Sequence, residues 1–280
     1  MRRPPACAGR FYEATAAGLQ EQVRSFLEIG VDPVPVKAVI CPHAGLMFSG
    51  AVAGAVYSRV LLPSIAILIG PNHTGYGPPL SVYAEGEWEV PGGVVPIAAG
   101  LARTLLDRFP EAQADQRAHQ YEHCLEVQLP FLRTRRPDIA VLPIVVGSRS
   151  FESCLALGLA LVSLIRDAGS ESPILIASSD MTHCGPGFGQ LPPAGLTADE
   201  FARLQDQLAL DAVQSLDERR FHATVEERDI TMCGYAPTTA VLAAARTLGA
   251  TRASVIRYAT SAEISGDVNR VVGYAGVVIN

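Results

Sequence analysis

Three histidines each follow an apolar segment that has the composition of a buried strand. The segments and their histidines are Val36–Cys41 with His43, Ile65–Ile69 with His73, and Ile174–Ala177 with His183. Ligands of α/β proteins bind at the carboxyl ends of the strands, and consecutive strands joined by one helix usually lie side by side. We therefore expect His43 and His73 to leave neighbouring strands and to reach one metal ion.

Cys233 is a candidate for a third ligand or for a nucleophile. It lies shortly before Pro237, a residue that suits the first turn of a helix. The positive end of a helix lowers the pKa of a nearby thiol and favours the thiolate, which both a metal ligand and a nucleophile require. The alternative is that Cys233 is simply a small buried residue, as most free cysteines are.

The segment Gln120–Glu126 places two glutamates and a histidine at the predicted start of a helix. Glu122 and Glu126 would share one face of that helix, and His123 and Glu126 could line a pocket and transfer protons. The plainer interpretation is that Glu122 stabilises the helix dipole and that Glu126 is solvated.

The remaining polar candidates carry weaker signals. Ser179, Asp180 and His183 superficially resemble a hydrolytic triad, but residues this close in sequence can scarcely adopt the required geometry, and no G-x-S-x-G motif is present. His119 and His222 lie among polar residues, and we expect both at the surface.

Strands and helices alternate along the chain. The predicted strands are Val36–Cys41, Ile65–Ile69, Ile139–Val146, Ile174–Ala177, Ala253–Tyr258 and Val271–Ile279, and the predicted helices are Thr15–Phe26, Gly50–Val60, Leu101–Phe109, Cys124–Arg133, Cys154–Ala168, Glu200–Ser215 and Pro237–Leu248. The strands are continuously apolar, as in sheets covered on both faces. We expect one α/β domain over residues 1–280, a layered sandwich with a mostly parallel central sheet flanked by helices. Pro79–Pro91 is expected to form a hairpin, and the Gly/Pro-rich Cys184–Leu196 an ordered loop at the mouth of the site.

Composition excludes several classes of function. The chain is 49% hydrophobic with a net charge of −6, and without a run of Lys and Arg it is not expected to bind nucleic acid. No apolar run approaches the ~20 residues that span a bilayer, so no membrane association is expected. The N-terminus lacks the apolar core of a secretory signal, which predicts a cytoplasmic protein. The six cysteines contain no C-x-x-C pair and are expected to be free thiols.

These motifs together resemble the Memo family, whose bacterial and archaeal members are called AmmeMemoRadiSam system protein B. The resemblance covers nearly the whole chain, through Ala8–Tyr12, Cys41–Gly45, Gly70–His73, Glu122–Glu126, Ser178–His183, Cys233–Gly234, Ser265–Asp267 and Val272–Ala275. It implies the fold of the class III extradiol dioxygenases, enzymes that bind non-haem Fe(II) through two histidines and a glutamate.

The resemblance also implies roles for individual residues. His43, His73 and Cys233 correspond to the metal ligands. His183, His123, Asp180 and Glu126 surround the same cavity as catalytic candidates, with His183 as the acid/base. Cys233 stands where the dioxygenases have glutamate, and because thiolate is a softer ligand, copper or zinc could replace iron(II).

The sequence is compatible with three functions. The first is an iron- or copper-dependent oxidoreductase that acts on a small molecule. The second is a non-catalytic adaptor that holds metal or a peptide in its cleft and docks a protein; family association points to radical-SAM and AMMECR-type partners. The third is a metal-free hydrolase in which His183 activates Cys233.

Overall fold

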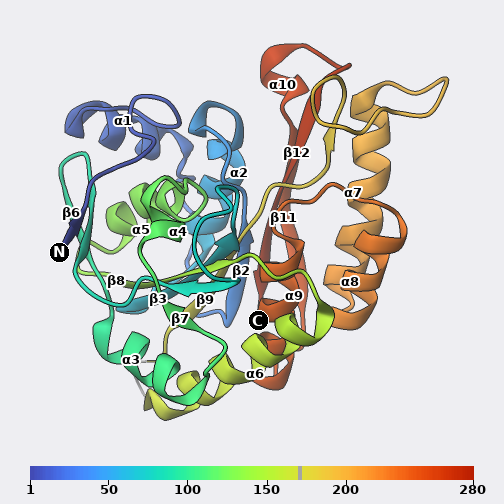
Figure 1. Cartoon of the computed structure of the whole chain (residues 1–280). Helices are drawn as coiled ribbons and strands as arrows, with labels where there is room; N and C mark the ends of the chain where they lie inside the picture. The colour runs from blue at the N-terminus through green and yellow to red at the C-terminus, as the bar shows by residue number, and fades with distance from the viewer. Residues whose placement is uncertain (170–171) are drawn as a thin grey trace.

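The computed structural model describes residues 1–169 and 172–280, which are arranged around a nine-stranded sheet (Figure 1). In order across the sheet the strands are β10 (His183–Cys184), β12 (Val271–Ile279), β2 (Ala38–Cys41), β9 (Ile174–Ser178), β3 (Ile65–Pro71), β8 (Ala140–Val146), β4 (Leu80–Val82) and β7 (Gln113–Ala114), and β11 (Ala253–Thr260) pairs with β12. The predicted α/β sandwich with a large central sheet is confirmed.

Helices cover both faces of this sheet. One layer contains α3 (Ala99–Arg108), α6 (Phe151–Asp167), α7 (Ala198–Gln214), α8 (Glu218–Glu227) and α9 (Tyr235–Thr247); the other contains α1 (Ala16–Phe26), α2 (Leu46–Arg59) and α5 (Leu129–Arg135). Successive side chains of a strand point to opposite faces. In β3, Ile67 and Ile69 therefore join one core, while Ala66 and Leu68 join the other. This double burial explains why the central strands are continuously apolar.

The order of the central strands differs from the expectation in one respect that matters for the site. β2 and β3 are not neighbours, because β9 lies between them and pairs in parallel with both. The residues that follow β9 therefore lie between those that follow β2 and β3. This arrangement brings the segment Ser178–His183 to the same sheet edge as His43 and His73.

Parallel pairing is confined mainly to the centre of the sheet. β2, β9, β3 and β8 run in parallel, whereas β12 is antiparallel to β2 and to β11, and β4 is antiparallel to β8. The sheet is thus mixed rather than mostly parallel. A continuous apolar run indicates burial on both faces but not strand direction, which is why the sequence did not reveal this.

The hairpin predicted at Pro79–Pro91 forms further along the chain. β4 joins the main sheet instead, and the hairpin consists of β5 (Glu87–Val90) and β6 (Gly93–Pro96). Together with β1 (Arg2–Arg3) these strands form a separate three-stranded sheet. The turn uses Gly92 at a φ of 87°, a left-handed conformation that glycine adopts without a Cβ penalty.

The helix expected to begin near Cys124 starts later. After α4 (Arg117–Gln120) the chain forms turns, a 3₁₀ turn η1 at Glu126–Gln128, and then α5. Pro130 in the first turn of α5 has no N–H and would clash with the carbonyl four residues earlier in a continuous helix. Glu122 and Glu126 therefore do not share a helix face.

His119 and His222 are not surface residues. The side chain of His119 is buried beside the rings of Tyr83 and Trp88, and burial lowers its pKa to about 3. His222, on α8, is 4% exposed and donates through Nε2 to a backbone carbonyl. Polar neighbours in sequence misled the prediction in both cases, because those neighbours point outward while the imidazoles pack on aromatic rings.

Glu126 holds the N-terminal segment against the body of the protein. Its carboxylate is fully buried and pairs with the buried Arg3 guanidinium at 2.5 Å. It also accepts hydrogen bonds from the backbone N–H groups of Ala6 and Cys7, the Cys7 thiol and the Tyr12 hydroxyl. Glu126 is therefore neither solvated nor a pocket residue, and the structure gives it a structural role in place of the expected proton transfer.

Within the described residues, none of the helices combines the length and apolar character needed to cross a bilayer.

Candidate metal centre

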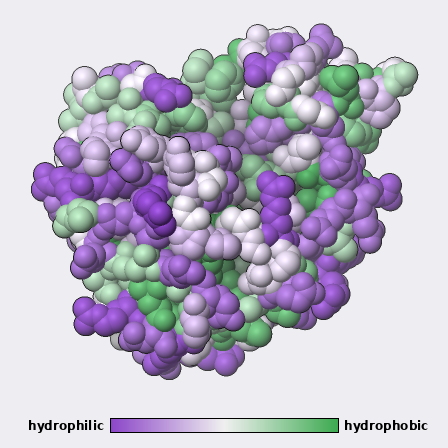
Figure 2. Space-filling model, in the orientation of Figure 1, coloured by the Kyte–Doolittle hydropathy of each residue, from purple (hydrophilic) through white to green (hydrophobic). Residues whose placement is uncertain are grey.

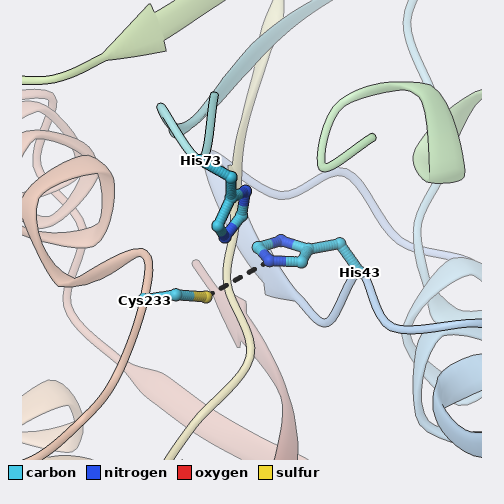
Figure 3. Close-up of side chains that lie close together, drawn as sticks. All are labelled: His43, His73 and Cys233. Carbon is cyan, nitrogen blue, oxygen red and sulfur yellow. Dashed lines mark hydrogen bonds between the residues drawn. The ribbon is translucent and has the colours of Figure 1, made fainter. Parts of the chain in front are cut away.

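His43, His73 and Cys233 converge from three separate elements (Figure 3). His43 lies just after β2, His73 just after β3, and Cys233 just before α9. The two imidazole rings stand edge to face with centroids 5.2 Å apart, and Cys233 Sγ lies 3.2 Å from His43 Nε2. One ligand atom from each residue falls within 4.8 Å of the others. Metal bonds of ~2.0–2.3 Å would separate such ligand atoms by roughly 3 to 3.5 Å, so the set fits a single ion.

The tautomer of His43 follows from its neighbours. Ser178 Oγ lies 2.6 Å from the Cys124 carbonyl, which can only accept, so the hydroxyl must donate to it. Because the Ser178 proton is used in that bond, His43 Nδ1, which lies 3.0 Å from Ser178 Oγ, must donate to Ser178. Gln128 Nε2 donates to Ser178 Oγ as well. The proton is thus held on Nδ1, which leaves Nε2 with a free lone pair directed at the centre.

Glu122 fixes His73 in a comparable way. The Glu122 side chain is buried, and its two oxygens accept from the His73 backbone N–H at 2.7 Å and from Nδ1 at 2.8 Å. Burial would raise the pKa of Glu122, but His73 and the other donors lower it to about 2, so this carboxylate is ionised. Because the ionised carboxylate can only accept, Nδ1 carries the proton and its N–H points at Glu122 in the plane of the ring. His73 is therefore oriented by a carboxylate and offers Nε2 to the centre.

The same geometry argues against a second ion at His73, Glu122 and His123, although their ligand atoms also lie within 4.8 Å of one another. A metal on His73 Nδ1 would occupy the line of the 2.8 Å hydrogen bond to Glu122, and two bonds of ~2 Å do not fit along it. We interpret Glu122 as a group that positions His73, and His123 as a neighbour of the centre.

Replacement of Glu122 by Gln is expected to weaken metal binding about 10- to 100-fold without abolishing it, the usual effect of losing a group that orients a ligand. The glutamine amide is neutral and no longer offers a carboxylate oxygen to His73 Nδ1, so the ring loses its preferred tautomer and orientation. Chelator competition measures the affinity, and Glu111→Gln, at an exposed position, serves as the matched control. An unchanged affinity in Glu122→Gln would show that His73 needs no such support.

Cys233 precedes α9, as predicted, with Gly234 at the N-cap. Burial would raise the pKa of the Cys233 thiol, but the facing rings of His43 and His73 lower it to about 5. Burial opposes charge on His73 too, yet Cys233 and Glu122 raise the pKa of His73 to about 10. Metal-free protein at neutral pH thus holds a thiolate beside an imidazolium, and a metal ion must displace the ring proton.

Alkylation of metal-free protein should report this thiolate directly. We expect iodoacetamide to label Cys233 at a rate that is constant at neutral pH and halves near pH 5, because protonation removes the nucleophile. The other five cysteines are buried and their pKa values are raised by burial, so they should stay unlabelled. Bound metal should protect Cys233. Labelling that metal does not slow would favour the hydrolase hypothesis.

The other candidate residues surround the centre in different ways. The His123 ring stacks on His73 at 4.6 Å, and burial lowers its pKa to about 4. Asp180 accepts from the backbone N–H groups of His43 and Ala44, so it holds the loop that carries His43. His183 Nδ1 lies 2.9 Å from the Met181 carbonyl, which can only accept. The ring proton is therefore on Nδ1, and Nε2 is the basic nitrogen.

A cavity of about 640 Å³ adjoins the centre. His73, His183 and Cys233 form part of its wall, together with Phe188 from the Gly/Pro-rich loop. That loop therefore lies at the mouth of the site, as the sequence predicted. The hydrolase hypothesis gains no support from the contacts, because the imidazole that meets the Cys233 sulfur belongs to His43 and not to His183.

Sequence reasoning missed two residues that organise the site. Ser178 ends β9 and accepts from His43, and its place directly after an apolar strand was the available signal. Gln128, in η1, joins Ser178 to the Tyr57 hydroxyl. A lone glutamine inside a mainly apolar segment gave no comparable indication.

Comparisons with known proteins agree with this architecture. A family model described as Memo-like protein matches residues 3–278. MEMO1 family proteins of Methanosarcina barkeri and Aquifex aeolicus are each 36% identical, covering 99% of this chain and 99% and 98% of their own lengths, respectively. A solved structure of an uncharacterized protein from Escherichia coli K12 has a TM-score of 0.60 at 17% identity, covering 88% of this chain and 100% of the other, and shows a shared fold. On the extent of these matches, this chain belongs to the Memo family.

Proposed function

We propose that the protein binds one redox-active metal ion, iron(II) or copper, through His43, His73 and Cys233, and acts on a small molecule in the adjoining cavity. The observation that carries the proposal is the convergence of two oriented imidazole nitrogens and a thiolate sulfur within 4.8 Å, beside that cavity. Two nitrogens and one sulfur suit iron, copper and zinc better than magnesium or calcium. Three protein ligands also leave coordination positions for a substrate.

The residues around the cavity would have distinct roles in this function. A bound iron or copper ion would supply electron transfer and polarise a ligand. Glu122 and Ser178 keep the two imidazoles in the tautomers that present Nε2. His183 lines the cavity with Nε2 as its basic nitrogen, so it can take a proton from a substrate and return it.

Metal content after anaerobic purification, without metal from an affinity column, tests the proposal. We expect about one iron or copper per chain, and we expect His183→Gln to retain that metal while losing any oxygen uptake with catechols as candidate substrates. Protein that contains neither iron nor copper and does not bind either with 1:1 stoichiometry would contradict the proposal. Stoichiometric zinc with no oxygen uptake would remove the redox part of it.

The adaptor function remains the second candidate, supported by the exposed aromatic side chains of Tyr76 and Tyr121, close in sequence to His73 and Glu122. On the face shown in Figure 2, hydrophobic residues form separate patches among hydrophilic ones. Radical-SAM and AMMECR-type proteins of the cytoplasm are the partners we propose for it. Tight binding of such a protein, together with absent oxygen uptake, would favour this candidate.

A further inference from the structure

One arginine, Arg149, lines the cavity beside the metal centre. It lies in the loop that follows β8, at the carboxyl edge of the central parallel strands, where ligands of such sheets bind. His222 fixes the position of this residue, because its Nε2 donates to the Arg149 carbonyl at 2.9 Å. The His222 ring in turn packs against Phe151 and Tyr235. The backbone of Arg149 is thus anchored on a buried side chain.

The guanidinium of Arg149 has no acidic partner within the described part of the chain. No carboxylate there lies within 4.0 Å of it, although Glu226 and Asp229 also line the cavity. Glu226 is already engaged, since its Oε1 accepts from the Tyr235 hydroxyl at 3.2 Å.

The cavity also has apolar side chains in its wall. Val225, Ile230, Met232 and Phe188 are among its lining residues. The Phe188 ring stands edge-on to His183 with centroids 5.4 Å apart, and the Arg270 guanidinium lies 4.7 Å from its centroid. Phe188 is therefore held between two side chains and forms a firm wall. An apolar or aromatic ligand body would gain free energy by covering these side chains.

We infer that the cavity takes a small organic anion, whose carboxylate or similar group pairs with Arg149 while its apolar body lies along Phe188 and its other end reaches the metal centre. The contact of the ligand with the metal centre rests on the proposed function. A planar guanidinium binds such a group through paired, charge-assisted hydrogen bonds. No bond is made or broken in this binding step.

The test uses two ligands that differ only in the anionic group, benzohydroxamate and 4-carboxybenzohydroxamate, titrated calorimetrically into cobalt(II)-loaded protein. The hydroxamate end binds metal, and the carboxylate is available to Arg149. We expect the carboxylated ligand to bind wild type about tenfold more tightly, a difference of about 1.4 kcal/mol. Arg149→Gln should remove the preference, Arg149→Lys should keep part of it, and Arg103→Gln, on the exposed side of α3, should not change it.

Titration of metal-free protein separates this inference from the proposed function. Without metal both ligands should bind more weakly, and the preference for the carboxylate should persist and still require Arg149. Equal affinity with and without cobalt would contradict the metal proposal while leaving the anion site intact. Equal affinity for the two ligands, no measurable binding of either, or a preference that survives Arg149→Gln would overturn the anion site.

Discussion

Removal of the Cys233 sulfur is expected to reduce metal affinity far more than the 10- to 100-fold predicted for Glu122→Gln, and to abolish stoichiometric binding at micromolar metal. Cys233→Ala leaves two imidazole nitrogens where three donors meet within 4.8 Å, and it removes the only anionic ligand of the set. His43→Ala and His73→Ala should have the same consequence, because each removes one of the two oriented nitrogens. Titration with Co(II), followed by its absorption spectrum, measures the loss and reports thiolate coordination.

Cys154→Ala is the matched control for this experiment. Cys154 is a free, buried thiol on α6, so its removal tests the general effect of losing a cysteine. It should leave metal stoichiometry unchanged. If Cys233→Ala retains metal as well as Cys154→Ala does, the sulfur is not a ligand.

The largest loss of stability is expected from Glu126→Ala, about 3–5 kcal/mol in the free energy of unfolding. The substitution leaves the Arg3 guanidinium buried without its counter-charge, and removing one partner of a buried ion pair has this cost. It also leaves the Cys7 N–H and Tyr12 hydroxyl without an acceptor. Urea denaturation monitored by circular dichroism measures the change.

The same N-terminal segment supplies the control. Arg2 pairs with Glu87 at 2.6 Å, but this pair is solvent-exposed, so Glu87→Ala should cost no more than about 1 kcal/mol. Similar losses for the two alanine variants would show that burial does not strengthen the Arg3–Glu126 pair.

The pH dependence of stability has a definite sign. Burial alone would raise the pKa of Glu126, but Arg3 and the surrounding donors hold that pKa below the ordinary glutamate value of 4.5. The contribution of Glu126 is therefore fully present above pH 4.5 and is lost as the pH falls through the lower pKa of the folded state. The free energy of unfolding of the wild type should therefore fall in acid by the contribution of Glu126, and the Glu126→Gln variant should not show this fall.

The convergence of the metal ligands could be predicted from sequence because it depends on strand ends. His43 and His73 follow apolar strands, and parallel strands end at one edge of a sheet whether or not they are neighbours. The prediction of adjacency was wrong, yet the two rings still meet, because the loops after β2 and β3 both reach over β9. Cys233 was marked by the helix that follows it.

The roles of the two glutamates could not be read in the same way. Glu122 and Glu126 were expected to share one face of a helix, but Pro130 delays that helix. The intervening turn directs the Glu122 carboxylate to His73 and the Glu126 carboxylate to Arg3. Contacts with residues 49 positions away, for Glu122, and 123 positions away, for Glu126, decide these roles. Burial of His222 likewise depends on Phe151 and Tyr235, which come from different helices.

X-ray absorption spectroscopy of anaerobically prepared, iron(II)-loaded protein tests the ligand set most directly. Two oriented imidazoles and a thiolate predict one sulfur scatterer at ~2.3 Å, nitrogen or oxygen scatterers at ~2.0–2.2 Å, and loss of the sulfur shell in Cys233→Ser. A first shell made only of nitrogen and oxygen, or a sulfur shell unchanged in Cys233→Ser, would contradict the metal centre described for this chain.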